Sequence, residues 1–161
     1  MVFFLDWSAS MADYMKDTIN QLLCLVLFCK KLNIPFEVYA FTTEFKKQKI
    51  SAENAKSKET ILDFTLMNIL SYKMTNREFN DDASLLLSIP NRGHFFEIDR
   101  GVNFSYGENL IPEWFRLGST PLNHSILASK TIAEELKKQT KTDIVNVITL
   151  SDGERSEEHT S

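Results

Sequence analysis

The first eleven residues, MVFFLDWSASM, constrain the fold of this chain more than any other stretch. An apolar run from Met1 to Leu5 ends at Asp6, and two hydroxyl residues, Ser8 and Ser10, follow at alternate positions. A short apolar run that ends at a carboxylate is typical of a buried parallel strand, the kind that opens α/β sheets. Because ligands of such sheets bind outside the carboxyl ends of the strands, the three polar residues are expected at a binding edge. Their small oxygen-bearing side chains, with no His or Cys among them, suit a hard cation such as Mg2+.

The rest of the chain alternates helical and strand patterns. Helices are predicted over residues 12–32, 76–88 and 120–139, and strands over residues 36–42, 64–70 and 144–150, the last of these buried. Residues 45–59 are polar and lysine-rich and are expected to form an excursion, whereas residues 91–115 have no pattern that we can assign. The alternation predicts an α/β domain, with a Rossmann-like parallel sheet and helices on both faces.

The spacing Asp6-x-Ser8-x-Ser10 resembles the first element of the metal-ion-dependent adhesion site (MIDAS) of von Willebrand factor A (VWA) domains. In that family a threonine from a second loop and an aspartate from a third loop complete the metal site. The sequence GSTPL at residues 118–122 opens a predicted helix and supplies Thr120. The sequence SDG at residues 151–153 follows a predicted strand and supplies Asp152. Three elements in order, each at a strand or helix boundary, are far more specific than one short motif.

The resemblance implies a site for Mg2+, or Mn2+, with a distinct role for each residue type. The three hydroxyl residues (Ser8, Ser10 and Thr120) would offer neutral oxygens directly. Asp6 and Asp152 would act directly or through water, orienting the hydroxyls and the waters of the ion. A mostly neutral set of ligands leaves the charge of the ion under-compensated, so a carboxylate from another protein would fill the open position. A nucleophile or a general base matched to a substrate is not visible in the sequence. The nearest imidazole, that of His124, lies one turn into a predicted helix, and we interpret it as a helix-face residue rather than a ligand.

Each element also has a purely structural interpretation. Asp6 and Ser10 can simply end a strand and cap a helix, and Thr120 before a proline is a good N-cap. The sequence SDG at 151–153 is turn-forming in its own right. One position departs from the family, which usually has glycine where this chain has Ala9. If that position requires a positive φ, alanine strains the loop and weakens metal binding.

Within VWA domains, the closest resemblance is to the cobaltochelatase subunit that carries a VWA domain, and to its phage-encoded relatives. The similarity rests on LDWSASM (5–11), FCKKLNIPFEVYAFTTE (28–44), GSTPLN (118–123) and LSDGE (150–154). It implies a cytoplasmic docking module, in the host cytoplasm if phage-encoded, that works with an AAA+ ATPase or another protein presenting an acidic residue. The chain has no GxxxxGK[ST] motif, so ATP hydrolysis is assigned to the partner.

Two other functions remain open. The chain can be a structural subunit of a cobalt or magnesium chelatase, acting in metal insertion into a tetrapyrrole, as in cobalamin biosynthesis. It can also be a phosphotransferase of the haloacid-dehalogenase type, which likewise places an aspartate after the first strand. That family needs a second acid two residues after the first, and this chain has Ser8 there.

Length and composition fit one domain and exclude several partners. The chain has 161 residues, 43% of them apolar, which suffices for a core. A formal charge of −4 and the lack of a basic stripe argue against nucleic acid. Residues 22–28 are apolar but too short to span a membrane, and no signal peptide is apparent. Cys24 and Cys29 lack metal-type spacing, so reduced thiols in the cytosol are expected.

The two ends of the chain carry separate expectations. We interpret residues 1–154 as a partial VWA-like domain, truncated at both ends, whose fold would continue with further strands. The strand at 144–150 would then be left as an exposed apolar edge. Residues 155–161 (RSEEHTS) resemble the translation of a sequencing adapter, and we treat them as a non-native tail.

Overall fold

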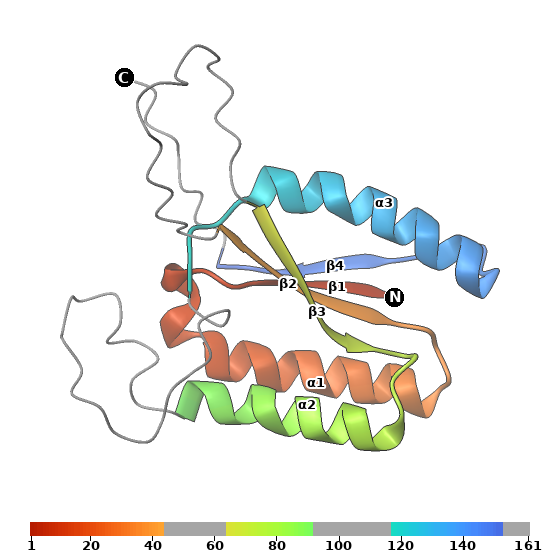
Figure 1. Ribbon diagram of the computed structural model, residues 1–161, viewed down its shortest axis with the longest axis horizontal. Coiled ribbons are helices and arrows are strands. Elements are labelled where there is room, and N and C mark those ends of the chain that lie inside the picture. Colours follow the sequence, from red (N-terminus) through yellow and green to blue (C-terminus); the bar gives the residue numbers. More distant parts are fainter. Residues whose placement is uncertain (44–63, 92–116, 153–161) are drawn as a thin grey trace, which may run out of the picture.

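The computed structural model describes residues 1–43, 64–91 and 117–152 (Figure 1). In chain order its regular elements are β1 (Val2–Asp6), η1 (Ala9–Asp13), α1 (Met15–Lys31), β2 (Glu37–Thr43), β3 (Phe64–Ser71), α2 (Asn76–Ser88), η3 (Ile89–Asn91), α3 (Leu122–Thr140) and β4 (Val147–Leu150). The predicted helices and strands are all found, most of them within one or two residues at each end. The excursion at 45–59, the unassigned residues 92–115 and the tail at 155–161 lie outside the described residues.

The strands form one mixed sheet in the order β3-β2-β1-β4. β1 pairs in parallel with both β2 and β4, whereas β3 runs antiparallel to β2. The predicted all-parallel sheet is therefore wrong for β3. A parallel pair needs a crossover connection, usually a helix, and the polar residues 45–59 between these strands lack a helical apolar pattern. An antiparallel edge strand on an otherwise parallel sheet is common in α/β folds, and the architecture is consistent with a Rossmann-like fold.

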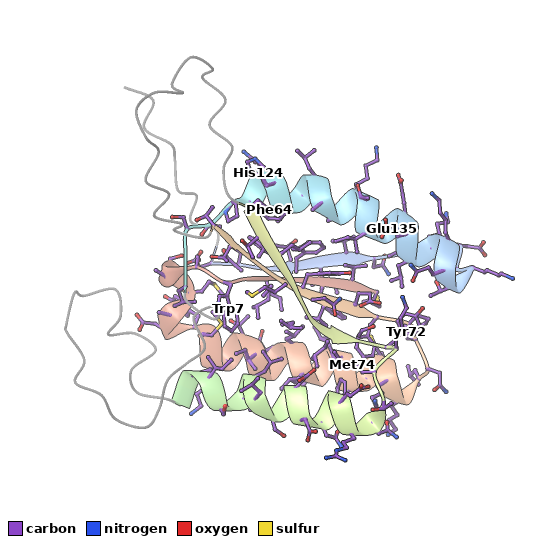
Figure 2. All side chains as sticks on the ribbon, viewed as in Figure 1. Trp7, Phe64, Tyr72, Met74, His124 and Glu135 are labelled. Atoms are coloured by element: carbon purple, nitrogen blue, oxygen red, sulfur yellow. The ribbon has the colours of Figure 1, made fainter. Side chains whose placement is uncertain are left out.

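Helices cover both faces of the sheet, as predicted. α1 and α2 lie on one face and α3 lies on the other (Figure 1). The central strand β1 is completely buried, and its side chains alternate between the two layers. Phe3, Leu5 and Trp7 join the core beneath α1 and α2, and Figure 2 places Trp7 in that layer. Val2 and Phe4 join the smaller core beneath α3.

The strand β4 differs from its prediction. It spans Val147–Leu150, shorter than the predicted 144–150, and lies at an edge of the described sheet. Its side chains alternate between exposed and half-buried, with Val147 39% exposed and the preceding Ile144 77% exposed. The expectation of a buried strand is thus wrong, and the expectation of an exposed apolar edge is confirmed for the described part.

Two residues predicted as helix caps do not act as caps. The N-cap of α1 is Tyr14 and that of α3 is Pro121, and neither makes a side-chain capping bond. Ser10 lies inside η1, and Thr120 precedes the cap of α3. The sequence rules for caps are local, whereas the Thr120 hydroxyl acts on Asp6, which is distant in the sequence, and the Ser10 hydroxyl lies beside that of Ser8.

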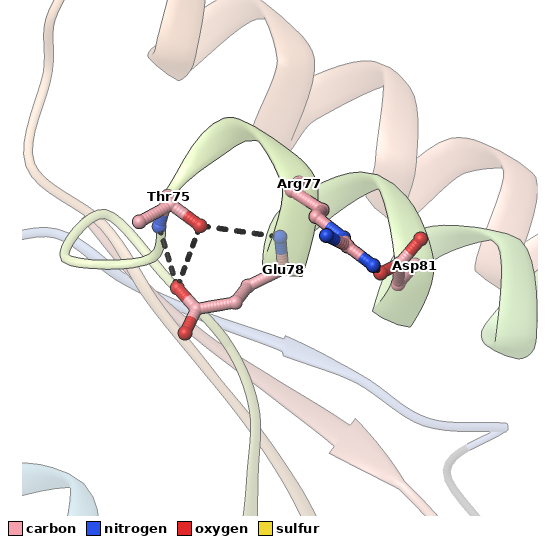
Figure 3. Close-up of polar contacts among 4 residues, drawn as sticks. All are labelled: Thr75, Arg77, Glu78 and Asp81. Atoms are coloured by element: carbon pink, nitrogen blue, oxygen red, sulfur yellow. Dashed lines mark hydrogen bonds and ion pairs between the residues drawn. The ribbon is translucent and has the colours of Figure 1, made fainter.

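α2 shows the side-chain capping arrangement that α1 and α3 lack (Figure 3). The Glu78 amide donates to the Thr75 hydroxyl at 3.3 Å, and the Glu78 carboxylate accepts from the Thr75 amide at 2.8 Å. This reciprocal pair is a capping box, which satisfies two otherwise unpaired N–H groups at the helix start.

None of the helices in the described ranges has both the length and the apolar character required to cross a bilayer.

Candidate functional site

Asp6, the last residue of β1, is the centre of the polar site. Its side chain is fully buried, and its Oδ2 accepts a hydrogen bond of 2.7 Å from the Ser151 hydroxyl. Its other oxygen, Oδ1, is buried without a hydrogen-bond partner among the described residues. A buried carboxylate oxygen without a partner is costly, so this atom needs an explanation such as an ion or a water.

Burial is the main reason why the pKa of Asp6 lies above its ordinary value. The hydroxyls of Ser151, Ser8 and Thr120 oppose this effect, because they stabilise the charged carboxylate. The nearby Asp152 carboxylate raises the pKa further by charge repulsion. Four residues from three turns therefore act on one carboxyl group.

Ser8 and Ser10 lie in the turn directly after β1. Ser8 is the extended residue before η1 and is 2% exposed, and its hydroxyl lies 3.1 Å from that of Ser10. The alternate spacing in the sequence therefore brings the two hydroxyls together. The backbone at Ala9 does not have a positive φ, because in the described part only Asn33 and Lys141 among non-glycine residues do. The concern that alanine strains this loop is removed.

The second loop is held against β1 and β2 by its backbone. The Ala9 amide donates to the Gly118 carbonyl at 3.0 Å, and the Gly118 amide donates to the Trp7 carbonyl at 3.2 Å. The Thr43 amide donates to the Ser119 carbonyl at 3.2 Å. These bonds place the next residue, Thr120, which is 7% exposed, beside Asp6.

Gly118 is required by space rather than by backbone conformation. A Cβ atom at this position would overlap the Thr43 carbonyl oxygen and the Thr42 hydroxyl. Only glycine therefore lets the loop approach β2 this closely. The sequence signal for this contact is the glycine two residues before Thr120.

The third turn follows β4, and strand register brings it to the site. β1 and β4 are parallel and pair Leu5 with Leu150, so the residues after Leu150 lie beside Asp6. Ser151 and Asp152 are both half-buried there. The strand order reverses between β1 and β4, and ligands of doubly wound sheets bind at this point, outside the carboxyl ends.

The structure thus places all five predicted site residues at one edge of the sheet. Asp6 interacts with Ser8, Thr120 and Asp152, and Ser10 is linked to them through Ser8. Ser151 was not predicted to have a role at the site. The sequence carries only a weak signal for it, a hydroxyl next to the candidate Asp152, because its contact depends on the register of two strands far apart in sequence.

The donor set fits a hard cation better than a soft one. Within residues 1–43, 64–91 and 117–152, no group of three or more His, Cys, Asp or Glu side chains is arranged to hold a metal. The candidate site has two carboxylates and three hydroxyls, all of them oxygen donors of the type that Mg2+ accepts. The unpartnered Oδ1 of Asp6 adds an acceptor that an ion, or a water bound to it, would satisfy.

His124, in the first turn of α3, is a packing residue. Its ring stacks on Phe64 with a centroid distance of 6.0 Å, as seen where the two labelled side chains meet in Figure 2. This contact agrees with its interpretation as a helix-face residue rather than a metal ligand.

Comparison of the chain with protein-family models, with curated proteins and with solved structures finds no match to any of them.

Proposed function

We propose that this chain is a metal-dependent protein-binding module of the VWA type, with its site at the carboxyl edge of the sheet. Three hydroxyl residues and two aspartates would hold Mg2+ or Mn2+ there, namely Ser8, Ser10, Thr120, Asp6 and Asp152. The observation that carries the proposal is the fully buried Asp6, whose Oδ1 lacks a hydrogen-bond partner in the described part of the chain.

The proposed site residues divide into two roles. The hydroxyl oxygens of Ser8, Ser10 and Thr120 can coordinate a cation while the same hydroxyls donate hydrogen bonds to neighbouring carboxylates. Asp6 and Asp152 would supply negative charge and orient the hydroxyls and bound waters. The bound ion would supply a positive centre with an open position. A carboxylate on another protein is the ligand of matching charge and hardness for that position.

The partner is proposed from the resemblance to the VWA-bearing cobaltochelatase subunit and its phage-encoded relatives. An AAA+ ATPase would bind this module in a chelatase-like or remodelling complex. We expect an ATPase encoded beside this chain to bind the chain in buffer that contains Mg2+, and not to bind it when a chelator removes the metal. Substitution Asp152→Ala would abolish that binding.

The metal proposal is tested by the thermal unfolding midpoint of the full chain, measured in Mg2+, in Mn2+ and in chelator. An ion present at 100 times its dissociation constant stabilises the fold by about 2.7 kcal/mol. For a chain of this size, such a gain raises the midpoint by about 5–10 °C. Ser8→Ala and Asp152→Ala should remove the rise.

Ser125→Ala is the matched control for Ser8→Ala. Ser125 is also a buried serine at 2% exposure, but its hydroxyl donates to the Leu122 carbonyl within α3. The Ser125→Ala variant should keep the full response to metal. Equal midpoints in Mg2+ and in chelator for the unmodified chain would rule out the proposed site.

A further inference from the structure

An exposed stripe of mostly apolar residues runs along α1 and the two residues that flank it, and we call it the α1 stripe. Its large apolar members are between 39% and 61% exposed, namely Tyr14, Leu25, Phe28 and Leu32. Thr18 and Gln21 complete it. The Thr18 hydroxyl donates to the Tyr14 carbonyl at 2.9 Å, so this hydroxyl is satisfied within its own helix. The solvent side of a surface helix usually carries polar residues, and an apolar stripe there points to a partner.

The spacing of the α1 stripe is that of a helix-helix seam. Successive members are alternately four and three residues apart, the repeat by which two helices pack along one line. The neighbouring helix α2 contacts a different side of α1, where Lys30 Nζ lies 4.2 Å from the centre of the Phe79 ring (Figure 1). The α1 stripe is therefore suited to a second helix other than α2.

The charges beside the α1 stripe indicate which helix fits and in which direction. Asp17 and Lys31 are exposed and border the stripe on the same side, near opposite ends of α1. A parallel second copy of α1 would place each charge opposite its like, which is repulsive. An antiparallel second copy would place Asp17 of each copy opposite Lys31 of the other. The stripe is thus complementary to itself under a two-fold rotation, as an interface between identical chains must be.

The middle of the α1 stripe agrees with the same arrangement. Cys24 is exposed and lies on the line that joins Asp17 to Lys31, so near the two-fold axis it would face Cys24 of the second copy. The surface is hollowed at this point, and the hollow is lined by Asn20, Gln21, Cys24 and Leu25. In the antiparallel register Leu25 of the second copy lies opposite Gln21, where it can enter this hollow as a knob enters a hole.

We propose that two copies of this chain associate through α1, in an antiparallel two-fold pair that buries the α1 stripe. One helix from each copy makes a small interface, which is typical of weak and transient association. The inference does not depend on the metal site, because the α1 stripe contains none of the proposed metal ligands.

The first test is sedimentation velocity of the full chain in a chelator, at concentrations up to about 1 mM, which covers weak complexes. We expect a shift from monomer to dimer as the concentration rises. Phe28→Glu should raise the dimer dissociation constant about tenfold or more, because it buries a charge in the seam. Leu127→Glu is the matched control, since Leu127 is a 72% exposed apolar residue of α3, and it should stay within about twofold. A chain that remains monomeric throughout, or two variants with equal effects, would overturn the proposal and leave the α1 stripe to another occupant.

Charge exchange tests the antiparallel direction. Asp17→Lys and Lys31→Asp should each weaken the dimer by about threefold or more, because each places like charges opposite one another. The double variant restores opposite charges and should recover most of the affinity. A double variant weaker than both single variants would overturn the antiparallel pairing.

Cross-linking tests the register at the two-fold axis. A short bis-maleimide should join two copies through Cys24, since the other thiol, that of Cys29, is buried. Cys24→Ser should abolish the covalent dimer. The control combines Cys24→Ser with Leu127→Cys, which moves the exposed thiol to α3, and it should give little covalent dimer. Equal yields from the two thiol positions would mean that the copies meet only by random collision, and the proposal would be wrong.

Discussion

Substitution of Gly118 by alanine tests whether the second loop is held in place by close backbone contact. The added Cβ atom would overlap the Thr43 carbonyl oxygen, a backbone atom that cannot rotate away, and the Thr42 hydroxyl. The loop must therefore move away from β2. That movement weakens the two backbone hydrogen bonds of Gly118, to the Ala9 amide and the Trp7 carbonyl.

The expected loss follows from three contributions. Overpacking a closely packed site costs about 1–3 kcal/mol. Each weakened backbone hydrogen bond costs about 0.5–1.5 kcal/mol. Replacing glycine by alanine offsets about 0.4–1 kcal/mol of this loss, because alanine lowers the conformational entropy of the unfolded chain. We expect the free energy of unfolding to fall by about 2–4 kcal/mol, and the thermal midpoint to fall by about 5–15 °C.

Urea unfolding of the full chain in a chelator measures this loss independently of any metal. Ser119→Ala is the control, because it changes the neighbouring residue while keeping the backbone atoms that bond to Thr43. It should lie within about 0.5 kcal/mol of the unmodified chain. A Gly118→Ala variant as stable as this control would refute the reasoning, since the loop would then have room for a side chain. We also expect Gly118→Ala to lose its response to Mg2+, because the displaced loop carries Thr120.

Two further predictions concern Asp6 and the start of α2. Because burial raises the pKa of Asp6 above its ordinary 3.8, the protonated form is favoured in the folded chain. Stability from this group is thus greatest below pH 3.8 and is lost as the pH rises through the pKa of the folded state. In metal-free buffer, the midpoint of the unmodified chain should fall relative to that of Asp6→Asn as the pH rises from acidic to neutral, and parallel pH profiles would contradict this. Thr75→Ala removes the capping box with Glu78 and should lower the free energy of unfolding by about 1 kcal/mol in urea titrations. Ser84→Ala, at an exposed position of the same helix, should have almost no effect, and equal losses in both variants would mean that the cap contributes nothing.

Hydrophobic periodicity in the sequence was sufficient to predict most of the fold. The apolar run that ends at Asp6 is the central buried strand, and the predicted bounds of α2 match the structure at both ends. The direction of β3 was not predictable, because a strand carries the same alternation whichever way it runs. The exposure of β4 was not predictable either. An apolar sequence shows that a strand is able to be buried, but not whether another strand or helix covers it.

The candidate site was predictable in its residues and only partly in its contacts. Sequence rules for helix starts favoured Ser10 and Thr120 as caps, and the structure shows that neither is one. Capping preferences consider only adjacent residues, whereas the buried Asp6 carboxylate offers these turns a partner from the sheet. The role of Ser151 was hidden for the same reason, since it arises from the register between β1 and β4.

The hydrogen bond between Ser151 and Asp6 joins residues that are 145 positions apart in the chain. Bringing these two residues together closes a long loop, and this entropic cost must be met before the contact can stabilise the fold. During synthesis, the site cannot be completed until Ser151 has left the ribosome, long after Asp6. An intact site therefore shows that β4 has joined β1 in the sheet, and any truncation before β4 removes it, whatever else remains folded.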